Sequence, residues 1–180
     1  HHRPATFFNE GVVAHVNMGD PFCNNLSKIL GDVSEKIIPG GRQLHRGGTY
    51  LAMEGPAFST RAESNLYKKW GCSIIGMTNH TEARLAKEAE IAYSSLAMVT
   101  DYDCWHHSHK EVSVDMVINN LKINTEIANK IVYQTAKKIS DERPESLSHK
   151  SLSNGLITSK ENVSKETKSK VKIFTDNYWL

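Results

Sequence analysis

The stretch from Thr49 to Ser64 constrains the fold of this 180-residue chain most, because it combines the signals of a strand, a turn and a helix start. Residues 49–53 alternate between apolar and other side chains like a strand, and Gly55-Pro56 breaks the run. Thr60 and Glu63 have the spacing of a capping box, which predicts that a helix begins there. In α/β folds, this order presents side chains at the carboxyl edge of a sheet.

Phe58 and Ser59 lie in that turn and form the first candidate ligand contact. They set a flat apolar face next to a small hydroxyl group. A planar heterocycle can stack on the phenyl ring and form a hydrogen bond near the serine.

Two later strand ends carry further candidates. A short buried strand is predicted at 72–75, followed by Met77 and Thr78, and a second strand at 94–100 is followed by Asp101 and Asp103. Carboxylates just past a buried strand are in a usual place for a ligand site, although a solvated turn fits equally well. Met77 alone fits an ordinary core methionine.

Helices and one more strand complete the expected elements. We predict a strand at 11–16, a helix at 24–38 that ends at Pro39-Gly40-Gly41, and a helix at 81–92 with Asn79 and Glu82 in capping-box spacing. A long amphipathic helix is expected from Ser113. Its apolar face comprises Val114, Val117, Ile118, Leu121, Ala128, Ile131 and Val132.

Composition limits the class of protein. Hydrophobic residues make up 39% of the chain and the net charge is only +2, which favours a globular protein and no nucleic-acid partner. The apolar runs are too short for a membrane span. Three cysteines without metal spacing indicate reduced thiols in a cytosolic protein. The histidines in 106–109 fit a mobile, polar active-site loop better than a metal site.

The chain divides into three parts by composition. Residues 1–140 form the main domain. Residues 141–172 are rich in serine and lysine without an aromatic residue, which predicts a polar, flexible insertion. Residues 173–180 are apolar again and are expected to dock onto the domain or a neighbouring subunit.

Several motifs in one order resemble the purine nucleoside phosphorylase family, and within it the branch that acts on methylthioadenosine. They cover roughly 3–132 and comprise Arg3-Pro4, Met18 to Cys23, Met53 to Ser64, Trp70-Gly71, Gly76 to Thr78, Leu85 to Ala89 and Ala97 to Trp105. The resemblance implies an α/β fold with a purine nucleoside phosphorylase-like mixed sheet flanked by helices. It also implies that the chain begins well past the start of the family's chains, beyond their glycine-rich phosphate loop.

The activity implied by the resemblance is phosphorolysis of S-methyl-5'-thioadenosine to adenine and 5-methylthioribose 1-phosphate. Inorganic phosphate is the co-substrate, no metal or organic cofactor is needed, and the expected assembly is a homotrimer in the cytoplasm or nucleus. No nucleic acid or membrane partner is expected. Two alternatives stay open. One is a phosphorylase for inosine and guanosine, and the other is a purine-binding module without catalysis.

The resemblance also implies roles for individual residues. Asp101 and Asp103 become catalytic groups against the purine, Ser59 orients Asp101, and Thr78 binds phosphate. Further substrate contacts are Phe58, Met77, and, around the 5′ substituent, His15, Val114, Val117 and Ile118. From the residues alone, His15 fits an ordinary half-buried histidine better.

The chain differs from parts of the resembling family at one tripeptide and at two single positions. Asn79-His80-Thr81 stands where the family has Thr-Val-Pro, so the proline that favours a helix start is absent. Inosine and guanosine phosphorylases carry glutamate at the position of Ser59 and asparagine at that of Asp101.

Overall fold

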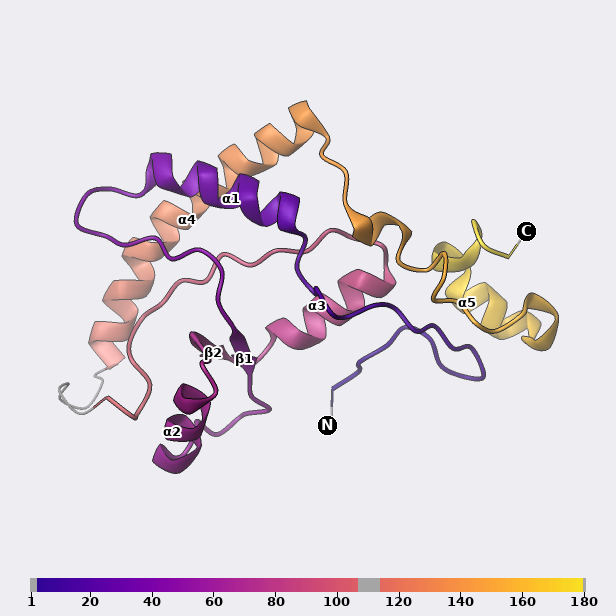
Figure 1. Ribbon diagram of the computed structural model, residues 1–180, viewed down its shortest axis with the longest axis horizontal. Helices are drawn as coiled ribbons and strands as arrows, with labels where there is room; N and C mark the ends of the chain where they lie inside the picture. Colours follow the sequence, from indigo (N-terminus) through magenta and orange to yellow (C-terminus); the bar gives the residue numbers. More distant parts are fainter. Residues whose placement is uncertain (1–2, 107–113, 180) are drawn as a thin grey trace. The chain divides into compact units, whose positions relative to one another are not determined.

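The computed structural model describes residues 3–106 and 114–179, which divide into two compact units (Figure 1). One unit, which we call the sheet unit, comprises 28–79 and 95–143. The other, which we call the terminal unit, combines the chain up to residue 27 with 80–94 and the chain from residue 144.

A βαβ element forms the centre of the sheet unit. It consists of β1 (Tyr50–Ala52), α2 (Arg61–Lys69) and β2 (Ile74–Gly76), and the two strands pair in parallel. The predicted strand before Gly55-Pro56 and the helix start after Thr60 are confirmed, while β2 begins two residues later than expected. This parallel pair makes up the whole sheet among the described residues.

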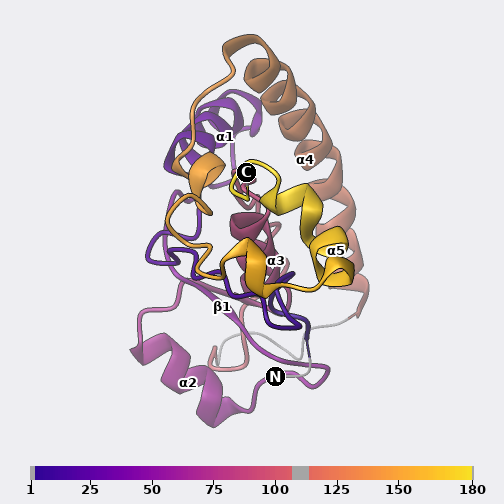
Figure 2. The same cartoon turned by 90° about the vertical axis from the view of Figure 1, so that its right-hand side faces the viewer.

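Helices α1 (Asn24–Ile37) and α4 (Val114–Glu142) lie side by side (Figures 1 and 2). Ile29 and Val33 of α1 and Ile131 of α4 are buried, as the apolar spacing of both helices predicts. Both long helices are therefore confirmed, with the residue before α4 lying outside the described ranges.

The expected strand at 94–100 is wrong, because the structure assigns no strand there. Within the described residues no neighbouring strand pairs with it. Two amide side chains of α4 donate to carbonyl groups of this segment instead. Asn120 Nδ2 lies 2.8 Å from the Thr100 oxygen, and Asn124 Nδ2 lies 3.0 Å from the Val99 oxygen. Side chains thus satisfy acceptors that a sheet ladder would otherwise use.

The terminal unit has its own core. Its elements are α3 (Asn79–Glu88), which starts at the last residue of the sheet unit, the 3-10 helices η1 (Leu147–Lys150) and η2 (Lys160–Asn162), and α5 (Lys165–Thr175). The buried apolar cluster comprises Phe8, Val12, Leu152, Val163 and Val171. Early and late parts of the chain therefore fold together in this unit.

Helix α3 differs from its predicted bounds at both ends. It begins at Asn79 itself, so this residue is inside the helix and does not serve as the expected cap. It ends at Glu88, and Glu90 adopts a φ of 58°, a left-handed conformation in which a helix cannot continue.

The segment 141–172, expected to be a flexible insertion, is folded in the structure. It contains η1, η2 and the larger part of α5. Leu152, Val163 and Val171 are its contribution to the buried cluster. A few well-spaced apolar residues therefore anchor a segment whose composition is mainly polar.

The strand expected at 11–16 is reduced to one antiparallel bridge between Ala14 and Leu156. The backbone N–H of His15 donates to the Gly155 oxygen at 2.7 Å. The N–H of Val13 instead donates to the side chain of Thr158, which interrupts a regular ladder.

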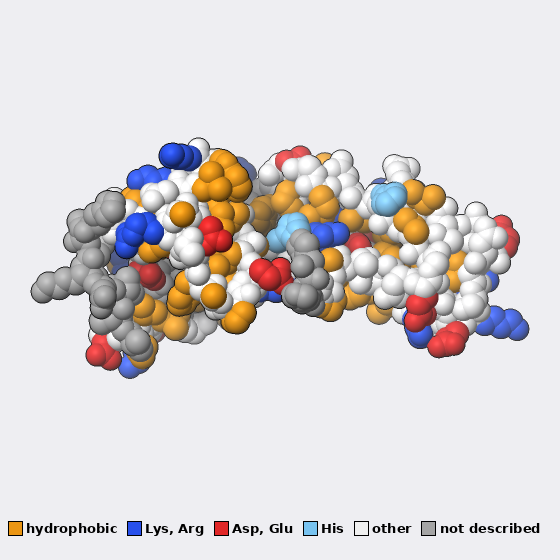
Figure 3. Space-filling view, turned by 90° about the horizontal axis from the view of Figure 1, so that it is seen from below, with side chains coloured by type: hydrophobic (Ala, Val, Ile, Leu, Met, Phe, Trp, Pro, Cys, Tyr) orange, Lys and Arg blue, Asp and Glu red, His pale blue; other side chains and the backbone are white. Residues whose placement is uncertain are grey.

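Large apolar side chains remain exposed, and orange patches mark such surface on the face shown in Figure 3. Phe58 is 87% exposed, and Trp70 and Ile173 are also exposed. No helix of the described ranges is long and apolar enough to span a membrane.

Candidate active site

The turn between β1 and α2 is fixed by the first turn of α2. The Thr60 hydroxyl accepts from the Glu63 N–H at 3.3 Å, and Glu63 Oε2 accepts from the Thr60 N–H at 2.7 Å. This reciprocal pair is the predicted capping box. Hydrogen bonds from the Thr60 backbone and hydroxyl lower the pKa of the Glu63 carboxyl group. Phe58 and Ser59 therefore directly precede a well-anchored helix end.

Phe58 and Ser59 differ in what they offer a ligand. The exposed Phe58 ring leaves a flat apolar face accessible. Ser59 is half-buried, and its hydroxyl donates to Asp103 Oδ2 at 3.4 Å. Ser59 thus follows the exposed Phe58 in the chain and forms a hydrogen bond with the Asp103 carboxylate.

Asp103 is surrounded by hydrogen-bond donors. The Ser64 hydroxyl donates to Oδ2 at 2.5 Å, and the Cys104 N–H donates to Oδ1 at 2.8 Å. The thiol of Cys104 also donates to the backbone carbonyl oxygen of Ser59 at 3.6 Å. These contacts hold the carboxylate in one orientation and leave a lone pair of Oδ1 to accept a further hydrogen bond.

Asp101 has different surroundings. It is exposed, and within the described residues its one hydrogen bond comes from the Thr100 hydroxyl. The expected contact with Ser59 is wrong, since the Ser59 hydroxyl donates to Asp103 instead. Of the two aspartates, Asp103 is the one that accepts from a residue of α2, Ser64.

Met77 and Thr78 follow β2 at the edge where the β1 turn also lies. The Met53 N–H donates to the Gly76 oxygen at 2.8 Å, which continues the parallel pairing towards both turns. Met77 Sδ lies 2.8 Å from the position of a Cβ atom added to Gly55, so these two turns are in close contact. Thr78 is exposed.

The 5′-pocket candidates fall in both units. Val117 is half-buried and Ile118 is 42% exposed on α4, while Val114 is the first residue of that helix and its side chain is outside the described part. His15 belongs to the terminal unit, where its side chain is exposed.

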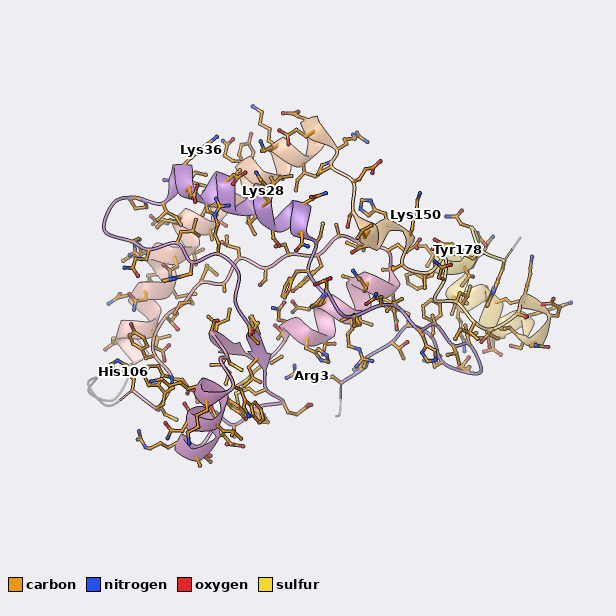
Figure 4. All side chains as sticks on the ribbon, viewed as in Figure 1. Arg3, Lys28, Lys36, His106, Lys150 and Tyr178 are labelled. Carbon is orange, nitrogen blue, oxygen red and sulfur yellow. The ribbon has the colours of Figure 1, made fainter. Side chains whose placement is uncertain are left out.

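An aromatic group lies next to the two aspartates. Tyr102 and His106, the latter labelled in Figure 4, stack with ring centroids 4.4 Å apart. Lys68 Nζ lies 3.4 Å from the centroid of the Trp105 ring, a cation–π contact. His107 and His109 lie outside the described residues. The residues described hold no group of three metal-type ligands.

The side of α2 that contacts residues 103–105 was not predicted from the sequence. Arg61, Ser64 and Lys68 contact Cys104, Asp103 and Trp105. Their spacing of three and four residues does predict one helix face. Nothing in the sequence indicates which loop that face binds.

Comparison with known proteins agrees with this geometry. The family model described as "Phosphorylase superfamily" matches residues 1–137, and the chain belongs to this superfamily. This confirms the expected fold class, of which the described residues form one parallel strand pair and its flanking helices.

The relatives that the chain resembles share one name. The chain is 63% identical over 179 residues to S-methyl-5'-thioadenosine phosphorylase of Prochlorococcus marinus, covering 99% of this chain and 57% of that protein. It is 44% identical to the enzyme of the same name from Aspergillus fumigatus, covering 98% and 53%. The chain thus spans a little over half the length of these relatives.

Solved structures show the same likeness. A crystal structure of a methylthioadenosine phosphorylase from an antarctic soil metagenomic library matches with a TM-score of 0.90 and 44% identity, covering 97% of this chain and 61% of that one. Methylthioadenosine phosphorylase from Schistosoma mansoni in complex with adenine matches with a TM-score of 0.68 and 26% identity, covering 97% and 61%.

Proposed function

We propose that this chain provides the base-binding part of an enzyme that cleaves S-methyl-5'-thioadenosine with phosphate, giving adenine and 5-methylthioribose 1-phosphate. The observation that carries the proposal is the Asp103 carboxylate, which accepts from Ser64 of α2 and from Ser59, the residue after the exposed Phe58. The 63% identical relative of this name supports the choice of substrate. The reaction would serve purine and methionine salvage.

In the proposed reaction, a phosphate oxygen forms a bond to C1′ while the bond from C1′ to the purine N9 breaks. The electron pair of that bond moves into the purine, so negative charge develops on the base. Catalysis then depends on groups that bind the leaving purine more tightly as this charge grows.

The two aspartates are assigned to two edges of the purine. Asp103 suits the 6-amino group, because donors already hold both of its oxygens and leave it only acceptor capacity. Asp101 suits N7, where a proton shared between carboxyl and ring nitrogen stabilises the charge on the leaving base. Phe58 and Met77 would contact the base and sugar, and the exposed Thr78 hydroxyl would contact phosphate.

The 5′ substituent is assigned on the family resemblance to His15 and to the start of α4, including Val114, Val117 and Ile118. Burying a thiomethyl group gains about 1 kcal/mol of apolar transfer energy, whereas a 5′-hydroxyl needs a polar partner. We expect a preference for methylthioadenosine over adenosine that Val117→Ala reduces. A preference for adenosine with Val117→Ala neutral contradicts this assignment.

The assembly proposed from the resemblance is a homotrimer in the cytoplasm or nucleus, with phosphate as co-substrate and without a metal or organic cofactor. Sedimentation of the complete enzyme tests the trimer, and activity after exhaustive chelation tests the absence of a metal requirement.

The function is tested with a chimera in which residues 1–180 replace the region they match in the Prochlorococcus marinus relative. We expect adenine release from methylthioadenosine that depends on phosphate. Adenine release that does not depend on phosphate contradicts the proposal. Binding of adenine without cleavage of methylthioadenosine also contradicts it. Residues 1–180 alone should release no adenine, because they span 57% of that relative.

A further inference from the structure

Helix α2 presents one face to the loop that carries Asp103. Along this face, the Arg61 guanidinium donates to the Cys104 oxygen, and Lys68 lies over the Trp105 ring. Ser64 stands between them in the helix and is 1% exposed. The loop is therefore attached to a helix at three successive points, and the central point is a buried hydroxyl group.

Ser64 accepts one hydrogen bond and donates another, and the first fixes the direction of the second. The Trp105 N–H donates to Ser64 Oγ at 3.2 Å and so occupies a lone pair of that oxygen. A serine hydroxyl carries one proton, which is then directed to Asp103 Oδ2 at 2.5 Å. Because the side chain is buried, water cannot easily replace either partner.

The remaining donors to Asp103 are weaker or less rigid. Ser59 is 3.4 Å away and lies in the turn before α2. The Cys104 N–H belongs to the residue next to Asp103 and moves with the loop. Within the described residues, Ser64 is thus the single short link between the carboxylate and a helix.

We infer that Ser64 is a positioning residue for base recognition: it orients Asp103 towards the purine without touching the substrate itself. This inference rests on the proposed function. A carboxylate released from Ser64 rotates away from the one orientation that accepts from a 6-amino group. We therefore expect kcat/KM to fall for 6-aminopurine nucleosides. It should not fall for 6-oxopurine nucleosides, which have no 6-amino donor for this carboxylate.

The test is the ratio of kcat/KM for methylthioadenosine to kcat/KM for methylthioinosine in the chimera. Ser64→Ala should lower this ratio on the order of tenfold, as expected for a lost hydrogen bond to a charged group. Ser34→Ala is the matched control. Ser34 is 0% exposed in α1, and its hydroxyl donates within its own helix to the Leu30 oxygen at 2.7 Å. It should leave the ratio unchanged.

A double variant separates a positioning role from a structural one. If Ser64 acts through Asp103, adding Ser64→Ala to Asp103→Asn should cause little further loss of the ratio. An equal loss for both substrates, or an unchanged ratio, overturns the inference. Should Ser64→Ala fail to fold, Ser64→Cys keeps a similar side-chain volume with a weaker donor and is measured in the same way.

A second readout does not depend on activity. Hydrogen exchange of the Trp105 amide should accelerate in Ser64→Ala and not in Ser34→Ala, because only the first variant removes its acceptor. Unchanged exchange overturns the inference even if the enzyme is active. Faster exchange in a chimera that cleaves no nucleoside supports the Ser64 link and instead contradicts the proposed function.

Discussion

Met77 Sδ occupies space that a side chain on Gly55 would need, 2.8 Å from the position of the added Cβ atom. Gly55 also has a φ of 71°, which disfavours any residue with a Cβ atom. Gly55→Ala should therefore lower the stability of the chimera by about 1–3 kcal/mol.

Gly41→Ala is the control for this substitution. Gly41 has a φ of 87° but nothing within 4 Å of the added Cβ atom, so it carries the backbone cost alone. Urea denaturation should show the larger loss for Gly55→Ala. Equal losses would mean that contact with Met77 contributes nothing.

The capping box of α2 predicts an acid-sensitive contribution to stability. Its Glu63 has a pKa below the usual 4.5 when folded, so its contribution is present above pH 4.5 and is lost as the pH falls through the folded value. The stability difference between the original chain and Glu63→Gln should therefore shrink on acidification. Thr60→Ser, which keeps the cap, should behave like the original chain. A difference that is constant from pH 3 to pH 7 would refute this account.

An alkaline effect is expected in the terminal unit. Burial and the hydrogen bond to Glu90 raise the pKa of Tyr178 from 10.0 to about 12. A raised pKa stabilises the fold below pH 10, and this contribution is lost as the pH rises towards 12. Tyr178→Phe should be less sensitive to pH over that range, measured by denaturation at each pH. Tyr133→Phe, at an exposed position, serves as the control and should keep the original alkaline slope.

Base preference provides a test of the two aspartates. The double change Ser59→Glu with Asp101→Asn introduces the residues found in inosine and guanosine phosphorylases. Asp101→Asn removes the carboxyl proton assigned to N7, and its amide can donate to the 6-oxo group that neighbours N7 on the purine. The chimera should therefore lose activity on methylthioadenosine and gain it on inosine. Specificity constants for both substrates decide this. If the unchanged chimera already cleaves inosine as well as methylthioadenosine, the assignment of these residues fails.

Ser59→Glu alone should behave differently. Ser59 now donates to Asp103, so the new carboxylate would stand next to an existing one. The same repulsion between like charges is present in the double variant, but the single variant lacks the Asp101→Asn amide that favours a 6-oxo group, so its activity should fall on both substrates. An isolated gain for inosine in this single variant would contradict the observed Ser59–Asp103 contact.

Elements with local signals were predictable from the sequence. The capping box at Thr60 and Glu63 and the glycine-proline break define α2 and the end of β1 within a few residues. The strand expected at 94–100 was wrong because a strand exists only with a partner, and the side chains of Asn120 and Asn124 take that place. The role of Ser64 was invisible, since it depends on a loop thirty-nine residues later in the chain.

The attachment of α4 to the chain just before Asp101 has a consequence for protein engineering. Asn120 holds the Thr100 oxygen, and Ile118 stands two residues earlier on the same helix. If this end of α4 contacts the 5′ group as proposed, a substitution that moves it to admit a larger group should also move the backbone that leads into Asp101. On the proposed roles of Ile118 and Asp101, we therefore expect selectivity at the two ends of the nucleoside to be epistatic. Libraries that vary Ile118 and Asp101 together should find combinations that separate single-site screens would discard.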